Sequence, residues 1–152
     1  MYQNILVPLD GSTLAECVLP HAKATAHSSD NPNIVFMRVI EMPVSMYSDL
    51  SDYQRSQVMA NKREEAKKYF EELITQIEHE GITVKCEVIF GKVSESIAEY
   101  ASRKEIDLIV IASHGSTGII GLVWGSIADQ VLQTSGLPVL MIRPPGYKLA
   151  TK

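Results

Sequence analysis

The chain has 152 residues, of which 45% are hydrophobic and 21% charged, and this composition is typical of one globular domain rather than a disordered or coiled-coil chain. Its formal net charge of −4 offers no basic surface for nucleic acid or for an anionic membrane. Because two cysteines are too few for a disulfide framework and no apolar run is long enough to span a membrane, we expect a cytoplasmic protein with reduced thiols.

Five short runs rich in Val and Ile predict the strands of a sheet. They are continuous rather than alternating, which is typical of strands buried on both faces. In chain order they are Ile5–Leu9, Ile34–Ile40, Val84–Phe90, Leu108–Ala112 and Val139–Ile142. Segments of helical character separate them. This alternation predicts right-handed crossovers and an α/β fold with a parallel sheet covered by helices on both faces.

The first helix is predicted from a spacing at its start. Thr13 and Glu16 have the spacing of a capping box, in which each side chain bonds a backbone amide of the other residue. We expect this helix to run toward His27 and to be kinked at Pro20, which removes one intrahelical hydrogen bond.

Three further helices are expected within Gln57–Glu80, at about Ser94–Lys104, and from Gly125-Ser126 to Gly136, where apolar residues recur at three- and four-residue spacing. The segment Met42–Ser56 has no clear period and is predicted to be a long loop. The chain is then predicted to form one domain over residues 1–145, followed by a flexible tail over 146–152.

The stretch with most chemical information is Ser113–Ser126, which follows the fourth predicted strand. It contains Gly115, Gly118 and Gly125 directly before a helix. Glycine lets backbone amides turn toward a ligand, and a helix N-terminus adds partial positive charge, so this stretch is suited to a phosphate chain. The common fingerprints GxGxxG and GxxxxGK[ST] are absent. A glycine-rich loop also has a purely structural interpretation, as a tight turn.

From Ala112 onward the chain reads A-x2-G-x9-G-S, which resembles the G-x2-G-x9-G-[ST] motif of the ATP-binding branch of the universal stress protein family. The opening 5–12, the strand 107–111, the helix 126–132 and the segment 138–143 are also similar to that family. The resemblance implies an open, doubly wound, Rossmann-like sheet of order 3-2-1-4-5. It also implies a homodimer and, in this branch, bound ATP or ADP, for which we expect Mg²⁺.

The resemblance further implies an ATP site at the ends of the first, second and fourth strands and at the start of the last helix. Asp10 would hold the ribose, Val39 would pack on adenine, and the Gly-Ser pair would hold phosphates. The full set is Pro8, Asp10, Val39, Ile111, Ala112, Gly115, Gly118, Gly125, Ser126 and Ile127. Asp10 has an alternative role, in capping the turn that follows it.

This sequence departs from the family pattern at two points. Ala112 replaces the first glycine of the motif and adds a methyl group where backbone and nucleotide approach. The loop from Gly115 to Gly125 carries no Lys or Arg, so its phosphate binding would depend on amides, the helix end, Ser126 and Mg²⁺. We expect weaker affinity and not loss of the site.

Three functions therefore remain open. The first is an ATP-binding regulatory or interaction module with an unidentified protein partner. The second is a nucleotide-free dimeric interaction protein of the same fold, and the third is a slow ATPase. No catalytic residue and no metal ligand set is assigned. The last strand is apolar and, in the order 3-2-1-4-5, lies at a sheet edge, so we expect the homodimer to form through Val139, Leu140, Met141 and Ile142.

Overall fold

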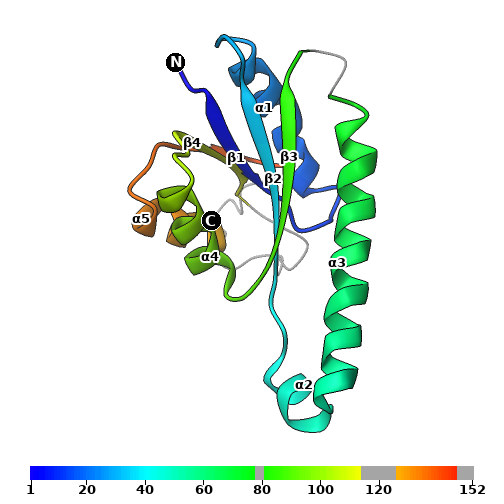
Figure 1. Ribbon diagram of the computed structural model, residues 1–152. Helices are drawn as coiled ribbons and strands as arrows, with labels where there is room; N and C mark the ends of the chain where they lie inside the picture. Colours follow the sequence, from blue (N-terminus) through cyan, green and yellow to red (C-terminus); the bar gives the residue numbers. More distant parts are fainter. Residues whose placement is uncertain (78–80, 114–125, 147–152) are drawn as a thin grey trace.

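Parallel strands in the order β3-β2-β1-β4-β5 form the centre of the molecule, with helices packed on both faces (Figure 1). The computed structural model describes residues 1–77, 81–113 and 126–146, and the statements below concern these residues. The strands are β1 (Asn4–Pro8), β2 (Asn33–Ile40), β3 (Thr83–Phe90), β4 (Leu108–Ala112) and β5 (Val139–Ile142). This confirms the predicted fold class and strand order.

The direction of chain progression across the sheet reverses between β1 and β4. β1 pairs with β2 on one side, where Leu6 lies opposite Val35, and with β4 on the other, where Leu6 lies opposite Ile109. From β1 the chain moves outward through β2 to β3, then returns to β4 and continues outward to β5. All these pairings are parallel, so the carboxyl ends of β1 and β4 lie at the same edge.

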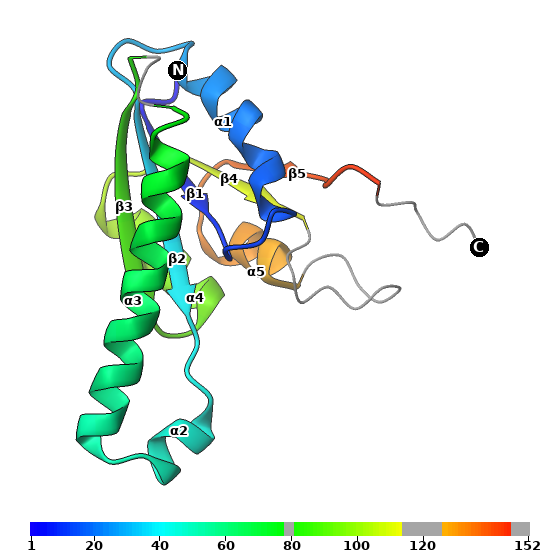
Figure 2. The same cartoon turned by 90° about the vertical axis from the view of Figure 1, so that its right-hand side faces the viewer.

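Each face of the sheet has its own helical layer. One face is covered by a 3-10 helix, η1 (Ala15–Val18), by α1 (Leu19–Ala26) and by α3 (Asp52–Ile74), and the other by α4 (Val93–Arg103) and α5 (Ser126–Thr134). The short α2 (Val44–Asp49) lies at the tip of an extension in which α3 continues past the sheet (Figure 2). No helix among the described residues has the length and apolar character that crossing a membrane requires.

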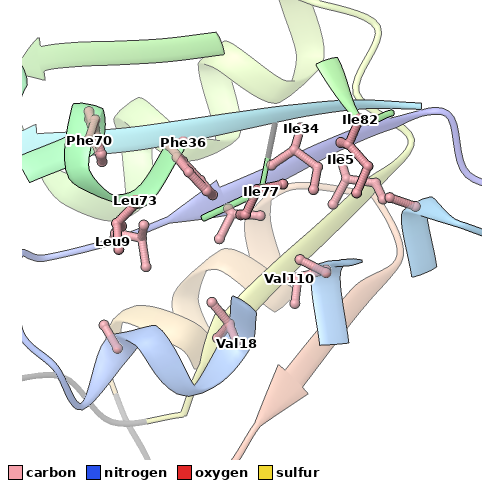
Figure 3. Close-up of a cluster of buried hydrophobic side chains, with 14 of the residues drawn as sticks. Ile5, Leu9, Val18, Ile34, Phe36, Phe70, Leu73, Ile77, Ile82 and Val110 are labelled. Carbon is pink, nitrogen blue, oxygen red and sulfur yellow. The ribbon is translucent and has the colours of Figure 1, made fainter. Parts of the chain in front are cut away.

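Two apolar cores hold these layers together. Beneath α1 and α3, the stacked rings of Phe36 and Phe70 lie 5.9 Å apart, and both side chains are fully buried (Figure 3). Beneath α4 and α5, Ile97 and Val131 pack against strand residues such as Ile109. Alternate residues of each strand serve alternate cores because strand side chains point to opposite faces with a period of two.

The predicted start of the first helix is wrong. Thr13 makes no cap, and η1 precedes α1 without a side-chain cap on Leu14. The turn is instead closed by Ser12, whose Oγ accepts a hydrogen bond from the Ala15 amide at 3.2 Å. Pro20 does not kink a helix. It lies in the first turn of α1, where its missing N–H costs no intrahelical bond.

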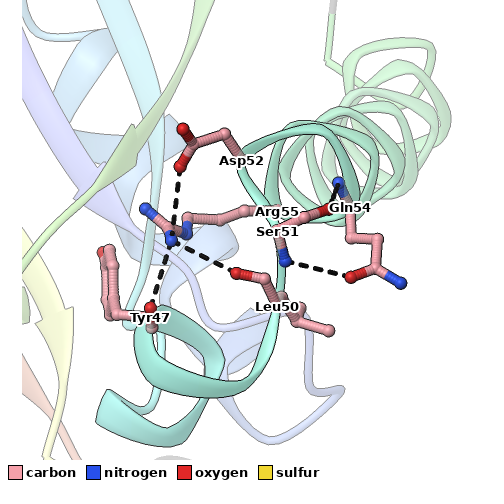
Figure 4. A network of polar contacts seen from close by, with 6 residues as sticks. All are labelled: Tyr47, Leu50, Ser51, Asp52, Gln54 and Arg55. Atoms are coloured by element: carbon pink, nitrogen blue, oxygen red, sulfur yellow. Dashed lines mark hydrogen bonds and ion pairs between the residues drawn. The ribbon is translucent and has the colours of Figure 1, made fainter.

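The predicted loop over 42–56 is also wrong, because it contains α2 and the start of α3. A capping box begins α3: the Ser51 Oγ accepts from the Gln54 amide at 3.2 Å, and the Gln54 side chain accepts from the Ser51 amide at 3.0 Å. The Arg55 guanidinium donates to the carbonyl oxygens of Tyr47 at 3.1 Å and Leu50 at 3.4 Å (Figure 4). These contacts fix α2 to α3 without any contribution from the core. α3 ends at Ile74, before the predicted end.

At the C-terminus, Pro144 is buried and Gly146 is exposed. The remainder of the predicted tail, residues 147–152, lies outside the described residues.

Candidate functional site

Asp10 lies in the loop that follows β1, at the carboxyl edge of the sheet. Its Oδ1 accepts hydrogen bonds from the Ser12 amide at 2.9 Å and from the Ser12 hydroxyl. The Ser12 Oγ in turn accepts from the first amide of η1. Asp10 therefore caps the turn that leads into η1, which is the alternative role expected from the sequence. The hydrogen bonds of this turn involve one carboxylate oxygen, Oδ1.

Three of the predicted site residues pack in the same core. Val39 at the end of β2, Ile111 near the end of β4 and Ile127 in the first turn of α5 all contact the cluster beneath α4 and α5. Pro8 ends β1 opposite Met37 of β2 and is half-buried. Ala112 is separated from this group, because it packs against the core on the α1 and α3 face.

The predicted phosphate side falls mostly on residues that the structure does not describe. Gly115, Gly118 and Gly125 lie outside the described residues. Ser126 is the first residue of α5. The helix start therefore follows β4 in the chain, as expected from the sequence.

A charged cleft on the α3 face was not predicted. It has a volume of about 260 Å³ and lies between the loop after β1, the end of β2 and the middle of α3. Its lining combines two cations, two carboxylates and a phenol: Asp10, Gly11, Arg38, Ile40, Lys62, Glu65, Ala66 and Tyr69. We call it the α3 cleft. Of the predicted site residues that the structure describes, only Asp10 belongs to it.

Tyr69 is held at the side of this cleft by a hydrogen bond. Its hydroxyl donates to the Glu16 Oε1 at 3.0 Å. Burial, followed by this hydrogen bond and the negative charge of Glu16, raises the pKa of Tyr69 above its ordinary range, while the Arg38 charge opposes the shift. Tyr69 is therefore a neutral phenol at physiological pH.

Both cysteines are free thiols that contact the α1 and α3 core. Burial raises the pKa of Cys17, and burial together with the charges of Glu71 and Glu87 raises the pKa of Cys86 to about 11. Because the thiolate is the nucleophilic form, neither group is activated for attack near neutral pH. Within the described ranges, no three His, Cys, Asp or Glu side chains form a group that could hold a metal ion.

Comparison with known proteins places this geometry in a family. The profile of the Universal stress protein family matches residues 1–143. Universal stress protein MJ0577 from Methanocaldococcus jannaschii is 28% identical to this chain, with 94% of this chain and 96% of that protein aligned. A solved structure of MJ0577 covers 97% of this chain and 99% of its own, with a TM-score of 0.85.

Two more distant structures contain a nucleotide. A universal stress protein in complex with cAMP is 22% identical and covers 93% of this chain and 96% of its own, with a TM-score of 0.61. A family member from Arabidopsis thaliana with AMP bound is 15% identical and covers 95% and 93%, with a TM-score of 0.62. At these identities the likeness establishes a shared fold.

Proposed function

Because the chain belongs to the universal stress protein family, we propose that it binds ATP or ADP with Mg²⁺ at the carboxyl edge of β1 and β4. In this proposal nucleotide occupancy controls its contact with a protein partner in the cytoplasm, so that the chain is a regulatory or interaction module rather than a rapid enzyme.

The observation that carries the proposal is the reversal of chain direction between β1 and β4. In open parallel sheets, ligands bind outside the carboxyl ends of the strands at such a point. Asp10 follows β1 here, and the N-terminus of α5 follows β4. β1 is thus followed by a carboxylate, and β4 is followed in the chain by the positive end of a helix.

The chemistry of these groups fits the parts of a nucleotide. A carboxylate such as Asp10 accepts hydrogen bonds from ribose hydroxyls, and the apolar side chains of Val39 and Ile111 suit an adenine ring. The amides at the start of α5 favour phosphate oxygens. Mg²⁺ would neutralise charge on the phosphate chain, which is needed because the segment from Gly115 to Gly125 contains no Lys or Arg.

Rapid hydrolysis would require a positioned water and further neutralisation of charge at the γ-phosphate. The predicted site residues provide no basic side chain, and their one carboxylate, Asp10, is assigned to the ribose. We therefore expect turnover below about 1 per second, the lower end of ordinary enzymes. Slow ATP hydrolysis is compatible with the binding role.

The test is calorimetric titration of Mg-ATP into the protein and into two variants of Asp10. Asp10→Asn retains an oxygen that can accept from Ser12, whereas Asp10→Ala removes the turn contact as well. Both should weaken Mg-ATP binding about ten- to hundredfold, the effect of losing a hydrogen bond to a charged group. Asp129→Asn changes an exposed carboxylate of α5 and is the matched control. Absence of binding at millimolar Mg-ATP would favour the nucleotide-free alternative.

The nucleotide-free dimer has its own supporting observation. β5 pairs only with β4 among the described strands, so its outer edge has unpaired backbone groups. Leu140 on this strand is 37% exposed. An apolar edge strand invites pairing with another chain, and pairing β5 with its copy about a two-fold axis satisfies both edges. The dimer is compatible with either function.

A further inference from the structure

The α3 cleft lies on the face of the sheet opposite Val39 and Ile111. Arg38 and Ile40 point into the α3 side, whereas Val39 between them packs in the α4 and α5 core. The proposed nucleotide site and this cleft therefore share the loop at Asp10 but use different faces of β2. The cleft requires an explanation of its own.

Arg38 is an unusual residue for its position in β2. It follows the buried Ile34 and Phe36 on the α3 face and is itself half-buried. Its guanidinium lies directly on the backbone of Gly11, since a Cβ at that glycine would be 2.4 Å from the Arg38 Nη1. Gly11 also has a φ of +83°, a conformation that favours glycine. Because Gly11 has no side chain, the loop after β1 leaves room for the Arg38 guanidinium in the cleft.

Lys62 brings a second cation into the same cleft from α3, and it is also half-buried. Neither Arg38 nor Lys62 forms a hydrogen bond or an ion pair with another residue in the described part of the chain. Elsewhere on α3, the exposed Lys67 lies 3.7 Å from Glu64. Asp10 and Glu65 also line the cleft, but no ion pair of Arg38 or Lys62 is found in the described part of the chain, so both cations can donate to an anion placed between them.

We propose that the α3 cleft binds a small phosphate monoester that carries hydroxyl groups. The planar guanidinium of Arg38 presents two parallel N–H donors to phosphate oxygens, and Lys62 adds a point charge. These two cations would face the phosphate, which carries a charge of about −1.5 to −2 at pH 7, while the carboxylates of Asp10 and Glu65 in the same lining would face the hydroxyl groups of the ligand.

The remaining lining suits the hydroxyl groups of such a ligand. The Tyr69 hydroxyl gives its hydrogen to Glu16, so its oxygen accepts from a ligand. Glu65 on α3 is an exposed acceptor at the cleft. The volume of about 260 Å³ is below the usual range of pockets for drug-sized ligands, which favours a small ligand.

The experiment is calorimetric titration with glycerol 3-phosphate, inorganic phosphate and glycerol in a phosphate-free buffer of constant ionic strength. We expect binding of the two phosphates, with glycerol 3-phosphate the tighter ligand, and no binding of glycerol. Arg38→Met and Lys62→Met should each weaken binding of glycerol 3-phosphate about tenfold or more. Using both keeps the test decisive if one variant fails to fold.

Arg63→Met is the control, because Arg63 is exposed and lies over the Phe90 ring outside the cleft lining. This variant should bind glycerol 3-phosphate like the unmodified protein. Equal affinity for all variants, or equal loss in Arg63→Met, would overturn the proposal.

Mg-ATP titrations on the same samples separate this proposal from the nucleotide site. Arg38→Met and Lys62→Met should bind Mg-ATP normally. Two results together would overturn the assignment to the α3 cleft: Mg-ATP prevents glycerol 3-phosphate from binding, and Arg38→Met still binds glycerol 3-phosphate normally. They would mean that glycerol 3-phosphate occupies the nucleotide site.

Discussion

Replacing Gly11 by alanine perturbs the loop after β1 in two separable ways. The backbone at Gly11 has a φ of +83°, and an L-residue in the left-handed region costs roughly 1–2 kcal/mol. Alanine also lowers the conformational entropy of the unfolded chain relative to glycine, which raises the free energy of unfolding by about 0.4–1 kcal/mol. The net backbone effect is therefore a loss of about 1 kcal/mol. The new Cβ would in addition be 2.4 Å from the Arg38 Nη1, so the guanidinium must withdraw.

This withdrawal should cost little stability, because the displaced group is the end of a flexible side chain. Gly136→Ala is the matched control. Gly136 has a φ of +65°, and no described atom lies within 4 Å of a Cβ built there. We predict that both variants lose about 1 kcal/mol in free energy of unfolding, or roughly 2–4 °C in Tm for a chain of this size. Only Gly11→Ala should also weaken binding of glycerol 3-phosphate.

The assay is urea unfolding followed by circular dichroism, with the phosphate titration on the same preparations. A Gly136→Ala variant of unchanged stability beside a Gly11→Ala variant that loses more than about 3 kcal/mol would contradict this prediction, because it would mean that the clash with Arg38, and not the backbone conformation, dominates the loss. An unchanged affinity of Gly11→Ala for glycerol 3-phosphate would contradict the position assigned to the Arg38 guanidinium.

Three further predictions concern the core, the thiols and the sheet edge. Phe70→Ala removes a fully buried ring and should lower the free energy of unfolding by about 3–5 kcal/mol. Tyr53→Ala is the control, because this residue is 74% exposed, and it should change the free energy of unfolding by under about 0.5 kcal/mol. Similar losses for the two variants in urea unfolding would contradict the packing described. Burial and neighbouring carboxylates raise the pKa of Cys86 from 9.0 to about 11, so the unfolded thiol ionises first, and its contribution to stability is present below pH 9 and is lost as the pH rises toward 11. Unfolding measured from pH 8 to 11 should therefore show a shallower decline for Cys86→Ala, and identical slopes would exclude the effect. Leu140→Lys should convert a dimer to a monomer in light scattering, and an unmodified protein that is monomeric at tens of micromolar would exclude the β5 interface.

The fold could be predicted from the sequence because its strands are encoded locally. Continuous runs such as 34–40 and 108–112 have no polar alternation, and this alone indicates strands covered on both faces. The order of the strands is not a local property, and it came from the resemblance to a family. The predicted helix boundaries failed where a different local signal competed. Ser51 and Gln54 have the spacing of a capping box, but the absence of an apolar period over 42–56 led to the prediction of a loop.

The candidate site was only partly predictable for a different reason. Asp10 and Val39 are found by their positions at strand ends, and Asp10-Gly11-Ser12 carries the Asp and Gly typical of a turn. The α3 cleft depends on Arg38 meeting Lys62, which lies on a different element 24 positions later in the printed sequence. A charged residue near the end of a buried strand, such as Arg38, already indicates a possible site in the sequence. Its partner across the cleft can be identified only after α3 has been placed on the sheet.

Mass spectrometry of the small molecules released when freshly purified protein is denatured shows directly whether the protein carries a nucleotide. Purification should use no added nucleotide, and Asp10→Ala prepared in parallel serves as the comparison. We expect ATP or ADP to be released from the unmodified protein, and a clearly smaller amount from Asp10→Ala. Absence of any adenine nucleotide, in a preparation that also fails to bind millimolar Mg-ATP, would contradict it.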